Sequence, residues 1–177
     1  MIKFTSSLSL LPLVAALFIP FNDAIAISQT TKLPAIHICS KSDPSYKILA
    51  CNLYKEARGE GTKGMMAVGF VTLNRLDDPA FPDSVRKVVY QPSQFSWTNS
   101  KKVASYKIHN RDSWKEAVSI SKSLIYLHNL NKFAYDFLDF SRGSVYYHST
   151  EVNPYWSKSF DRVGKIGNHI FYSRKEG

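Results

Sequence analysis

The feature that most constrains the fold of this chain is a densely apolar stretch from about Lys63 to Arg75. On a helical projection its apolar side chains leave almost no polar face. A helix that is apolar nearly all round is buried, because an exposed side would keep apolar surface in water. We therefore predict that this segment is the central helix of a hydrophobic core. Its apolar members are Met65, Met66, Ala67, Val68, Phe70, Val71 and Leu73.

A second helical pattern precedes this stretch. Asp43 and Pro44 form a capping residue followed by proline, a pair that favours a helix start. Apolar residues then recur at three- and four-residue steps as far as Ala57, and Gly59 and Gly61 mark the end. The sequence therefore predicts an amphipathic helix that ends just before the central helix begins.

Weaker signals continue after the central helix. Ser84 predicts the cap of a short helix that Pro92 stops. Residues 93–111 have the composition of a long surface loop, which in a compact domain usually has a function such as lining a cleft. The spacing of Ser113 and Glu116 is that of a capping box and predicts the start of another helix.

The C-terminal part of the chain has a different pattern. Val145-Tyr146-Tyr147 and Ile170-Phe171-Tyr172 are short runs with high strand propensity, and Gly164 and Gly167 between them are turn signals. We therefore expect a small β hairpin that packs on the helices. The predicted fold class is α+β, mainly helical, in one compact domain that spans residues 27–177.

Residues 1–26 have the features of a secretion signal. Lys3 gives a positive start, an apolar stretch runs from Leu8 to Phe21, and Ala24-Ile25-Ala26 has the small-x-small pattern of a signal-peptidase site. A buried N-terminal helix and a membrane anchor are the alternatives. An anchor requires about 20 apolar residues, and this stretch is shorter and interrupted by proline. We predict export to the periplasm or the cell exterior, with no stable membrane insertion after cleavage.

The net charge indicates the kind of partner. The chain of 177 residues has a formal net charge of +9, which favours an anionic partner such as nucleic acid, an anionic membrane or a cell-wall polymer. Export argues against nucleic acid, and no run of lysine and arginine is long enough for a polybasic arm. A cell-wall polymer therefore fits both the charge and the predicted compartment.

The chain has two cysteines, Cys39 and Cys51. An exported protein permits a disulfide, which here would close a short loop and tie the N-terminal segment to the first predicted helix. Two free buried thiols are the alternative, because sequence does not show whether the two Cα atoms come within reach. We favour the disulfide.

Glu56 is the leading candidate for chemistry, because it falls on the last turn of the first predicted helix, beside Tyr54 and Ala57. Apolar surroundings disfavour the charged form of a carboxyl, so its pKa rises and it can hold a proton near neutral pH. A glycosidase needs such a proton donor for the leaving oxygen. The alternative is a solvated helix-end glutamate that pairs with Lys55 or Arg58.

Two blocks of motifs cover residues 50–172 in a specific order. The first contains Glu56-Ala57-Arg58-Gly59-Glu60, Gly64-Met65-Met66-Ala67-Val68, Leu73-Asn74-Arg75, Phe81-Pro82, Val88-Val89-Tyr90-Gln91 and Gln94-Phe95. The second contains Gly143-Ser144-Val145-Tyr146-Tyr147-His148, Asn153-Pro154-Tyr155-Trp156 and Ile166-Gly167-Asn168-His169-Ile170-Phe171-Tyr172. This combination closely resembles the SleB-like cell-wall hydrolases, the family of the spore-cortex-lytic enzymes.

The resemblance implies a lysozyme-like or lytic-transglycosylase-like fold and activity on peptidoglycan. Glu56 would be the catalytic acid, and the β-1,4 link between N-acetylmuramic acid and N-acetylglucosamine would be the bond cut. In the lytic route the muramic acid's own 6-hydroxyl attacks, which requires one carboxyl that acts first as acid and then as base. We expect a monomer that acts on glycan strands without a metal or cofactor. Members of the family are also described as amidases, so amide cleavage is an alternative.

Several residues in the second block are candidates for substrate binding. Tyr147 and Trp156 could stack on a sugar face, and Asn153 could donate a hydrogen bond to an acetamido group. His148 lies in the same motif-rich segment, whereas His169 is more typical of a buried, hydrogen-bonded residue. The alternative for the aromatic residues is a packed hairpin, because such rings dominate cores as well as binding sites.

Residues of the first block add three further candidates. Phe95 and Trp97 border the predicted loop and are expected to line the groove, with core packing of one or the other as the alternative. Glu60 follows the first helix, where we expect it to be more solvated than Glu56 and able to contact substrate.

Three other functions remain open. A zinc amidase needs histidine and carboxylate ligands, and His148, His169 and Glu56 would have to meet through the tertiary fold, since no two histidines have the short helical spacing of a zinc motif. A cysteine peptidase would use Cys51, which lies inside a predicted helix rather than at a helix start. A non-catalytic wall-binding module would require only the basic charge and the aromatic residues.

Overall fold

The computed structural model describes residues 37–101 and 106–175. The predicted signal peptide, residues 1–26, lies outside the described residues. Within the described residues, no helix combines the length and the apolar character that a membrane-spanning segment requires.

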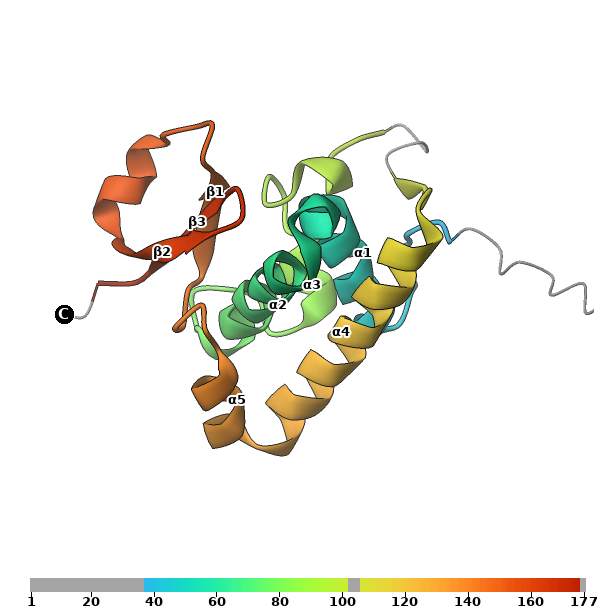
Figure 1. Ribbon diagram of the computed structural model, residues 1–177, viewed down its shortest axis with the longest axis horizontal. Coiled ribbons are helices and arrows are strands. Elements are labelled where there is room, and N and C mark those ends of the chain that lie inside the picture. The colour runs from blue at the N-terminus through green and yellow to red at the C-terminus, as the bar shows by residue number, and fades with distance from the viewer. Residues whose placement is uncertain (1–36, 102–105, 176–177) are drawn as a thin grey trace, which may run out of the picture. The chain divides into compact units, whose positions relative to one another are not determined.

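Helix α2 (Gly61–Asp77) lies at the centre of the domain, as its apolar pattern predicts. Helices α1 (Ser45–Ala57) and α4 (Arg111–Leu130) pack on one side of α2, and a small sheet packs on the other (Figure 1). The main core therefore lies between α1, α2 and α4. The remaining helical elements are η1 (Arg58–Glu60), α3 (Val85–Val89), η2 (Ser96–Thr98), α5 (Lys132–Leu138) and η4 (Tyr155–Ser159).

The start of α1 differs from the predicted cap. Helix α1 begins at Ser45 with Pro44 as its N-cap residue, and no side chain caps it. Asp43 instead accepts a hydrogen bond from the Ser40 amide at 2.9 Å, so its carboxylate orders the segment before the helix. The predicted cap of α3 is confirmed, because the Ser84 side chain accepts a hydrogen bond from the backbone of that helix.

The capping box predicted for α4 is wrong. Helix α4 begins at Arg111, and the Asn110 side chain caps it by accepting a hydrogen bond from the Ser113 amide at 2.9 Å. Glu116 does not close back on its own helix, because it accepts a hydrogen bond from the Thr62 hydroxyl at the start of α2. The spacing of Ser113 and Glu116 therefore matches a capping box, but Glu116 makes a hydrogen bond to another helix instead.

The described parts of the segment predicted as a long surface loop are anchored to the helices. Phe95 and Trp97 are buried, and the Trp97 indole donates a hydrogen bond into the core. The Tyr54 hydroxyl of α1 accepts hydrogen bonds from the backbone amides of His109 and Asn110. The described residues of this segment are thus attached to the hydrophobic core at several points and do not form a fully solvated loop.

The sheet has three antiparallel strands in the order β1-β3-β2, namely β1 (Tyr146–Ser149), β3 (His169–Ser173) and β2 (Asp161–Ile166). The two predicted strands correspond to β1 and β3, which pair antiparallel but are not neighbours in sequence, because β2 lies between them and joins β3 through a turn at Gly167. The sequence did not predict β2, and Gly164 lies within this strand at a register shift rather than in a turn.

The two faces of the sheet have different neighbours. Tyr147 pairs with Phe171 in the β1–β3 register, and Phe171 packs on Ala67 and Val71 of α2. Tyr146, His148 and Tyr172 alternate with these residues and contact the rings of η4 instead. Because side chains alternate along a strand, one face of the sheet packs on α2 and the other is covered by aromatic residues of η4.

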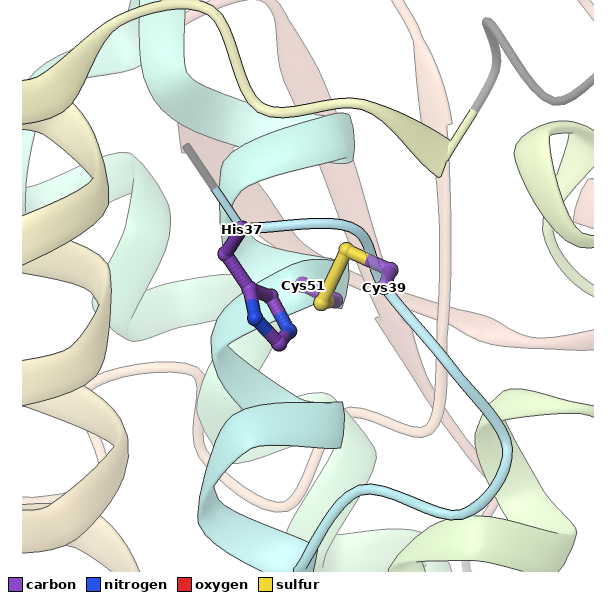
Figure 2. Close-up of side chains that lie close together, drawn as sticks. All are labelled: His37, Cys39 and Cys51. Carbon is purple, nitrogen blue, oxygen red and sulfur yellow. A yellow bond between two sulfur atoms is a disulfide. The ribbon is translucent and has the colours of Figure 1, made fainter. Parts of the chain in front are cut away.

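The disulfide between Cys39 and Cys51 is confirmed, with the two Cα atoms 6.0 Å apart. It joins the N-terminal segment to α1, as Figure 2 shows. The neighbouring His37 ring stacks on Trp114 of α4 at 4.8 Å and hydrogen-bonds Asp43 at 2.8 Å. These contacts fasten the segment before α1 to both α1 and α4.

Candidate active site

Glu56 occupies the last turn of α1, as predicted, and its side chain is partly buried. The Tyr147 hydroxyl of β1 donates a hydrogen bond to Glu56 Oε2 at 3.3 Å. Burial raises the pKa of Glu56 above its ordinary value, and the Tyr147 hydrogen bond opposes part of that rise. This combination favours a protonated carboxyl at a higher pH than in water, as a general acid requires.

Tyr147 is a reliable donor to this carboxyl. Burial raises the pKa of the Tyr147 phenol well above its usual range, and the negative charge of Glu56 raises it further. The phenol therefore keeps its proton at any pH near neutrality and can donate to either ionisation state of Glu56. It joins the last turn of α1 to the sheet by a direct hydrogen bond.

A groove of about 640 Å³ lies beside this pair. Tyr147 belongs both to the groove wall and to the hydrogen bond with Glu56, so it joins the acid, which is not itself a lining residue, to the wall of a space large enough for sugar residues. The wall is rich in aromatic side chains, which are suited to stack on sugar rings. Its residues are Arg75, Ser93, Gln94, Tyr146, Tyr147, His148, Val152, Pro154, Trp156 and Phe160.

His148 lines this groove, but both of its ring nitrogens are engaged within the protein. Nδ1 lies 2.8 Å from the Ser149 carbonyl oxygen, and Nε2 lies 2.9 Å from the Tyr172 hydroxyl. A carbonyl only accepts, so Nδ1 carries the proton and Nε2 accepts from Tyr172 in the neutral ring. His148 therefore holds the groove wall in shape, and neither nitrogen is available to a metal ion.

Trp156 lines the groove as part of an aromatic cluster. Its ring contacts Tyr146, His148 and Phe160 at centroid separations of 5.5, 5.6 and 6.0 Å. The predicted packing of these rings is thus confirmed for Trp156, whereas its stacking on a sugar face stays a prediction that its place in the groove wall permits. Asn153 is exposed, and its chain neighbours Val152 and Pro154 line the groove while its own side chain does not.

Phe95 and Trp97 do not line the groove, which corrects their predicted role. Their exposed fractions are 2% and 7%, and both belong to the main core. The Trp97 indole nitrogen donates to Asn52 Oδ1 at 3.1 Å inside the core. A tryptophan whose polar atom is satisfied in the interior is fully used for packing, so the core alternative holds for both residues.

Glu60 and Arg58 also differ from their predicted roles. Both carboxylate oxygens of Glu60 accept hydrogen bonds from Asn168 in the β2–β3 turn. Arg58 stacks over the Tyr54 ring at 5.0 Å and donates to the Tyr54 carbonyl, whereas an ion pair with Glu56 or Glu60 was predicted as an alternative. Glu60 is thus tied to the sheet, and Glu56 has a tyrosine as its partner.

Arg75 is a groove residue that the sequence did not single out. The residue is 4% exposed, and its Nε donates to the Val145 carbonyl oxygen at 2.8 Å. It also lies over the rings of Phe81 and Tyr146. The signal that could have revealed it is an arginine at the end of an otherwise apolar, buried helix, because a buried cation needs partners.

His169 is buried, as predicted, but its hydrogen bonding differs from the prediction. Among the described residues its Nδ1 has no hydrogen-bond partner, and its ring lies edge-on to Tyr147 at 5.0 Å. Burial lowers the pKa of His169, so this ring is neutral at pH 7.

Two of the rival functions can be compared with this geometry. Cys51 is fully buried and bonded to Cys39, so it offers no thiolate nucleophile. In the part of the chain that the structure describes, the group of residues with metal-ligand spacing is His37, Cys39 and Cys51, whose two sulfur atoms are already joined (Figure 2). The candidate site therefore centres on Glu56.

The chain belongs to the cell wall hydrolase family, which residues 59–172 match. It is 30% identical to the spore cortex-lytic enzyme of Halalkalibacterium halodurans over 85% of this chain and 40% of that protein. It is 33% identical to the spore cortex-lytic enzyme of Bacillus subtilis over 73% of this chain and 38% of that protein. The chain thus spans about two fifths of the length of these relatives.

Solved structures confirm the fold class. The catalytic domain of the Bacillus cereus SleB protein aligns with a TM-score of 0.54 at 25% identity, over 73% of this chain and 89% of that domain. The catalytic domain of the germination-specific lytic transglycosylase SleB from Bacillus anthracis aligns with a TM-score of 0.55 at 24% identity, over 76% of this chain and 100% of that domain. The mainly helical, lysozyme-like architecture with a small sheet is therefore shared with these domains.

Proposed function

We propose that this protein cuts the glycan strands of peptidoglycan as a lytic transglycosylase, with Glu56 as its catalytic acid. The observation that carries the proposal is the Tyr147–Glu56 hydrogen bond, which holds a carboxyl of raised pKa at the edge of an aromatic groove. The family match and the names of the spore cortex-lytic relatives support peptidoglycan as the substrate.

In the proposed reaction, protonated Glu56 gives its proton to the oxygen that links N-acetylmuramic acid to N-acetylglucosamine. The bond from this oxygen to the muramic acid C1 breaks, and C1 acquires oxocarbenium character. The 6-hydroxyl of the same muramic acid then bonds to C1, while its proton passes to the Glu56 carboxylate. This step leaves a 1,6-anhydro end and returns Glu56 to its starting state.

This route needs one carboxyl, and the neighbourhood of Glu56 fits that requirement. The second glutamate of the motif, Glu60, uses both of its oxygens to accept hydrogen bonds from Asn168. A retaining glycosidase needs a second carboxylate as nucleophile about 5 Å from the acid, free to reach C1. Because Glu60 is engaged with the β2–β3 turn, attack by the substrate's own hydroxyl fits this site better.

The groove supports binding of a sugar chain in this proposal. Tyr146, Tyr147 and Trp156 provide ring faces and edges, and Gln94 adds an amide that can hydrogen-bond a hydroxyl or an acetamido group. Asn153 remains a proposed contact at the rim, since its neighbours line the groove. The net charge of +9 suits the anionic cell wall.

We propose further that the chain is exported through its residue 1–26 leader and acts as a monomer in the periplasm or outside the cell. The pattern of the leader and the presence of a disulfide both agree with an oxidising compartment. Appearance of the mature chain, beginning after Ala26, in the periplasmic or culture fraction would test this assignment.

The products of digestion test the proposed reaction. Purified peptidoglycan is incubated with the protein, and the soluble fragments are identified by mass. Anhydro-muropeptides are the expected products. Reducing-end muropeptides would make the enzyme a hydrolysing glycosidase, and free stem peptides would contradict glycan cleavage and make it an amidase.

A further inference from the structure

Glu60 links two distant parts of the chain. Its Oε2 accepts a hydrogen bond from the Asn168 backbone amide at 2.8 Å, and its Oε1 accepts one from the Asn168 side-chain amide at 3.1 Å. Glu60 ends the short helix η1 directly after Glu56's helix, and Asn168 lies in the β2–β3 turn. Both oxygens thus accept from donors of one residue, which makes the contact charge-assisted and directional.

The surroundings of this contact leave room for Glu60 only because two glycines flank it. A Cβ atom on Gly167 would lie 2.1 Å from Glu60 Oε2, and one on Gly64 would lie 2.2 Å from Glu60 Cβ. Gly167 also has a φ of +56°, which disfavours residues with a Cβ. The backbone therefore leaves room for the Glu60 side chain from both sides, at its Cβ by Gly64 of α2 and at its carboxylate by Gly167 of the turn.

A short series of contacts leads from this turn to the catalytic acid. Asn168 precedes His169, whose ring lies edge-on to Tyr147 at 5.0 Å. His169 pairs with Ser149 and Phe171 pairs with Tyr147, so His169 and Tyr147 occupy the same face of the sheet. Tyr147 in turn donates to Glu56. The turn that Glu60 holds is thus adjacent to the residue that positions Tyr147.

We propose that Glu60 is a positioning residue: by holding the β2–β3 turn through Asn168, it keeps the Tyr147 hydroxyl on the Glu56 carboxyl. This inference rests on the proposed function of Glu56. It replaces the predicted role of Glu60 as a substrate contact, because both of its oxygens are already used within the protein.

Exchange of the amide and the carboxylate between the two residues provides the test. In Asn168→Asp, the new carboxylate faces the Glu60 carboxylate, so the side-chain hydrogen bond is lost and the two charges repel each other. Glu60→Gln alone keeps both bonds, because the Asn168 amide can turn over and accept from the new NH₂. In Glu60→Gln/Asn168→Asp, that NH₂ donates to the new carboxylate and both bonds return. We expect kcat on soluble glycan fragments to fall about tenfold in Asn168→Asp, with KM little changed, and to recover in the double variant.

A direct role of Glu60 in substrate binding predicts the opposite pattern. Glu60→Gln would then raise KM, Asn168→Asp would not rescue it, and Asn168→Ala would leave activity intact. Under the positioning role, Asn168→Ala lowers kcat as Asn168→Asp does. Failure of Glu60→Gln to rescue Asn168→Asp, or a normal kcat in Asn168→Ala, would overturn the inference.

A cycle with Tyr147→Phe shows whether Glu60 acts through Tyr147. We expect Asn168→Asp to lower kcat much less in the Tyr147→Phe background than in the native chain, because the Tyr147–Glu56 hydrogen bond that the Glu60–Asn168 contact maintains is already gone. Equal effects in both backgrounds would show that Glu60 does not act through Tyr147 and would overturn the inference.

Two controls keep these results interpretable. Glu116→Gln alters a different glutamate that also accepts a tertiary hydrogen bond, from Thr62, and should leave kcat near the native value. Thermal unfolding of every variant reports whether the fold is retained, and recovery in the double variant excludes general misfolding. If Glu56→Gln itself keeps full activity, the proposed function fails, whereas a missing rescue with an inactive Glu56→Gln refutes only the role of Glu60.

Discussion

The helical part and the sheet part of this domain are held together by different kinds of contact. Helices α1, α2 and α4 share a continuous apolar core in which the largest side chains are fully buried. The sheet has one small apolar contact with α2, through Phe171, and otherwise depends on aromatic packing and on directional polar contacts. These polar contacts include Tyr147 with Glu56, Arg75 with Val145, Glu60 with Asn168 and Arg174 with Asp78.

This difference matters because the site takes parts from both regions. The helical part supplies Glu56, and the sheet part supplies Tyr147 and most of the groove wall. A rigid apolar core tolerates modest surface changes, whereas a few directional contacts each determine where the sheet lies. We therefore expect site geometry to depend more on single polar contacts at the sheet than on the exposed faces of the helices.

The largest effect is expected from Arg75→Ala. This change removes the hydrogen bond to Val145 and the stem that packs among Phe81, Phe95 and Tyr146. The free energy of unfolding should fall by about 3 kcal/mol, since a buried, charge-assisted hydrogen bond and its packing are both lost. Urea unfolding gives this value, and activity should fall as well because Arg75 lines the groove.

Arg75→Met is the matched variant, because methionine keeps most of the stem and lacks the donors. We expect a loss of stability smaller than that of Arg75→Ala, since packing is retained. Stability equal to that of the native chain in both variants would show that the sheet does not depend on this contact. It would also contradict the view that single polar contacts hold the sheet while an apolar core holds the helices.

Removal of the disulfide tests the helical part. Cys39 and Cys51 are 12 residues apart, and the double replacement Cys39→Ser/Cys51→Ser should lower the free energy of unfolding by about 2–3 kcal/mol through the loss of loop closure. Urea unfolding with an activity assay well below the transition separates the two effects. We expect stability to fall much more than kcat, and an equal loss of both would show that the disulfide also shapes the site.

Tyr147→Phe tests the contact between the two regions. The hydrogen bond from Tyr147 lowers the pKa of Glu56, so its removal lets burial raise that pKa further. A general acid loses activity as the pH rises through its pKa, so the alkaline limb of the kcat profile should move to higher pH, with kcat about tenfold lower. Tyr155→Phe, at an exposed ring of η4, should leave the limb in place.

The smallest expected effect concerns stability at Glu56 itself. Because burial raises its pKa in the folded state, the protonated form is stabilised, and this contribution is lost as the pH rises through the folded pKa. Glu56→Gln should therefore raise the melting temperature slightly at pH 7. The gain should disappear below pH 4.5, the ordinary value for this carboxyl. A higher melting temperature that persists at acidic pH would show that the increase does not come from the burial of a charged Glu56 carboxylate.

The sequence predicted the helical part well because its signals are short-range. The apolar pattern of α2, the Ser84 cap and the place of Glu56 on the last turn of α1 all depend on residues within a few positions of one another. The sheet was predicted less completely. Strand β2 carries Asp161 and Lys165 on exposed positions and has a register shift at Gly164, so it lacks the alternating pattern of a typical strand.

The roles of the site residues were harder to predict than their positions. The motifs drew attention to Tyr147 and Glu60, but both were expected to contact substrate. Tyr147 meets Glu56 across 91 residues of sequence, and Glu60 meets Asn168 across 108. No local pattern encodes such pairings, and the burial of Phe95 and Trp97 likewise depends on how α1 and α2 enclose them.

The most direct test of the central claim measures binding and cleavage on the same samples. Native protein and Glu56→Gln are mixed with insoluble peptidoglycan, and the bound protein and the released soluble fragments are both quantified. If Glu56 is the catalytic acid, we expect both proteins to bind peptidoglycan equally. The native protein should release soluble fragments, and Glu56→Gln should release almost none. Full release of fragments by Glu56→Gln, or binding by the native protein without any release of fragments, would contradict this role.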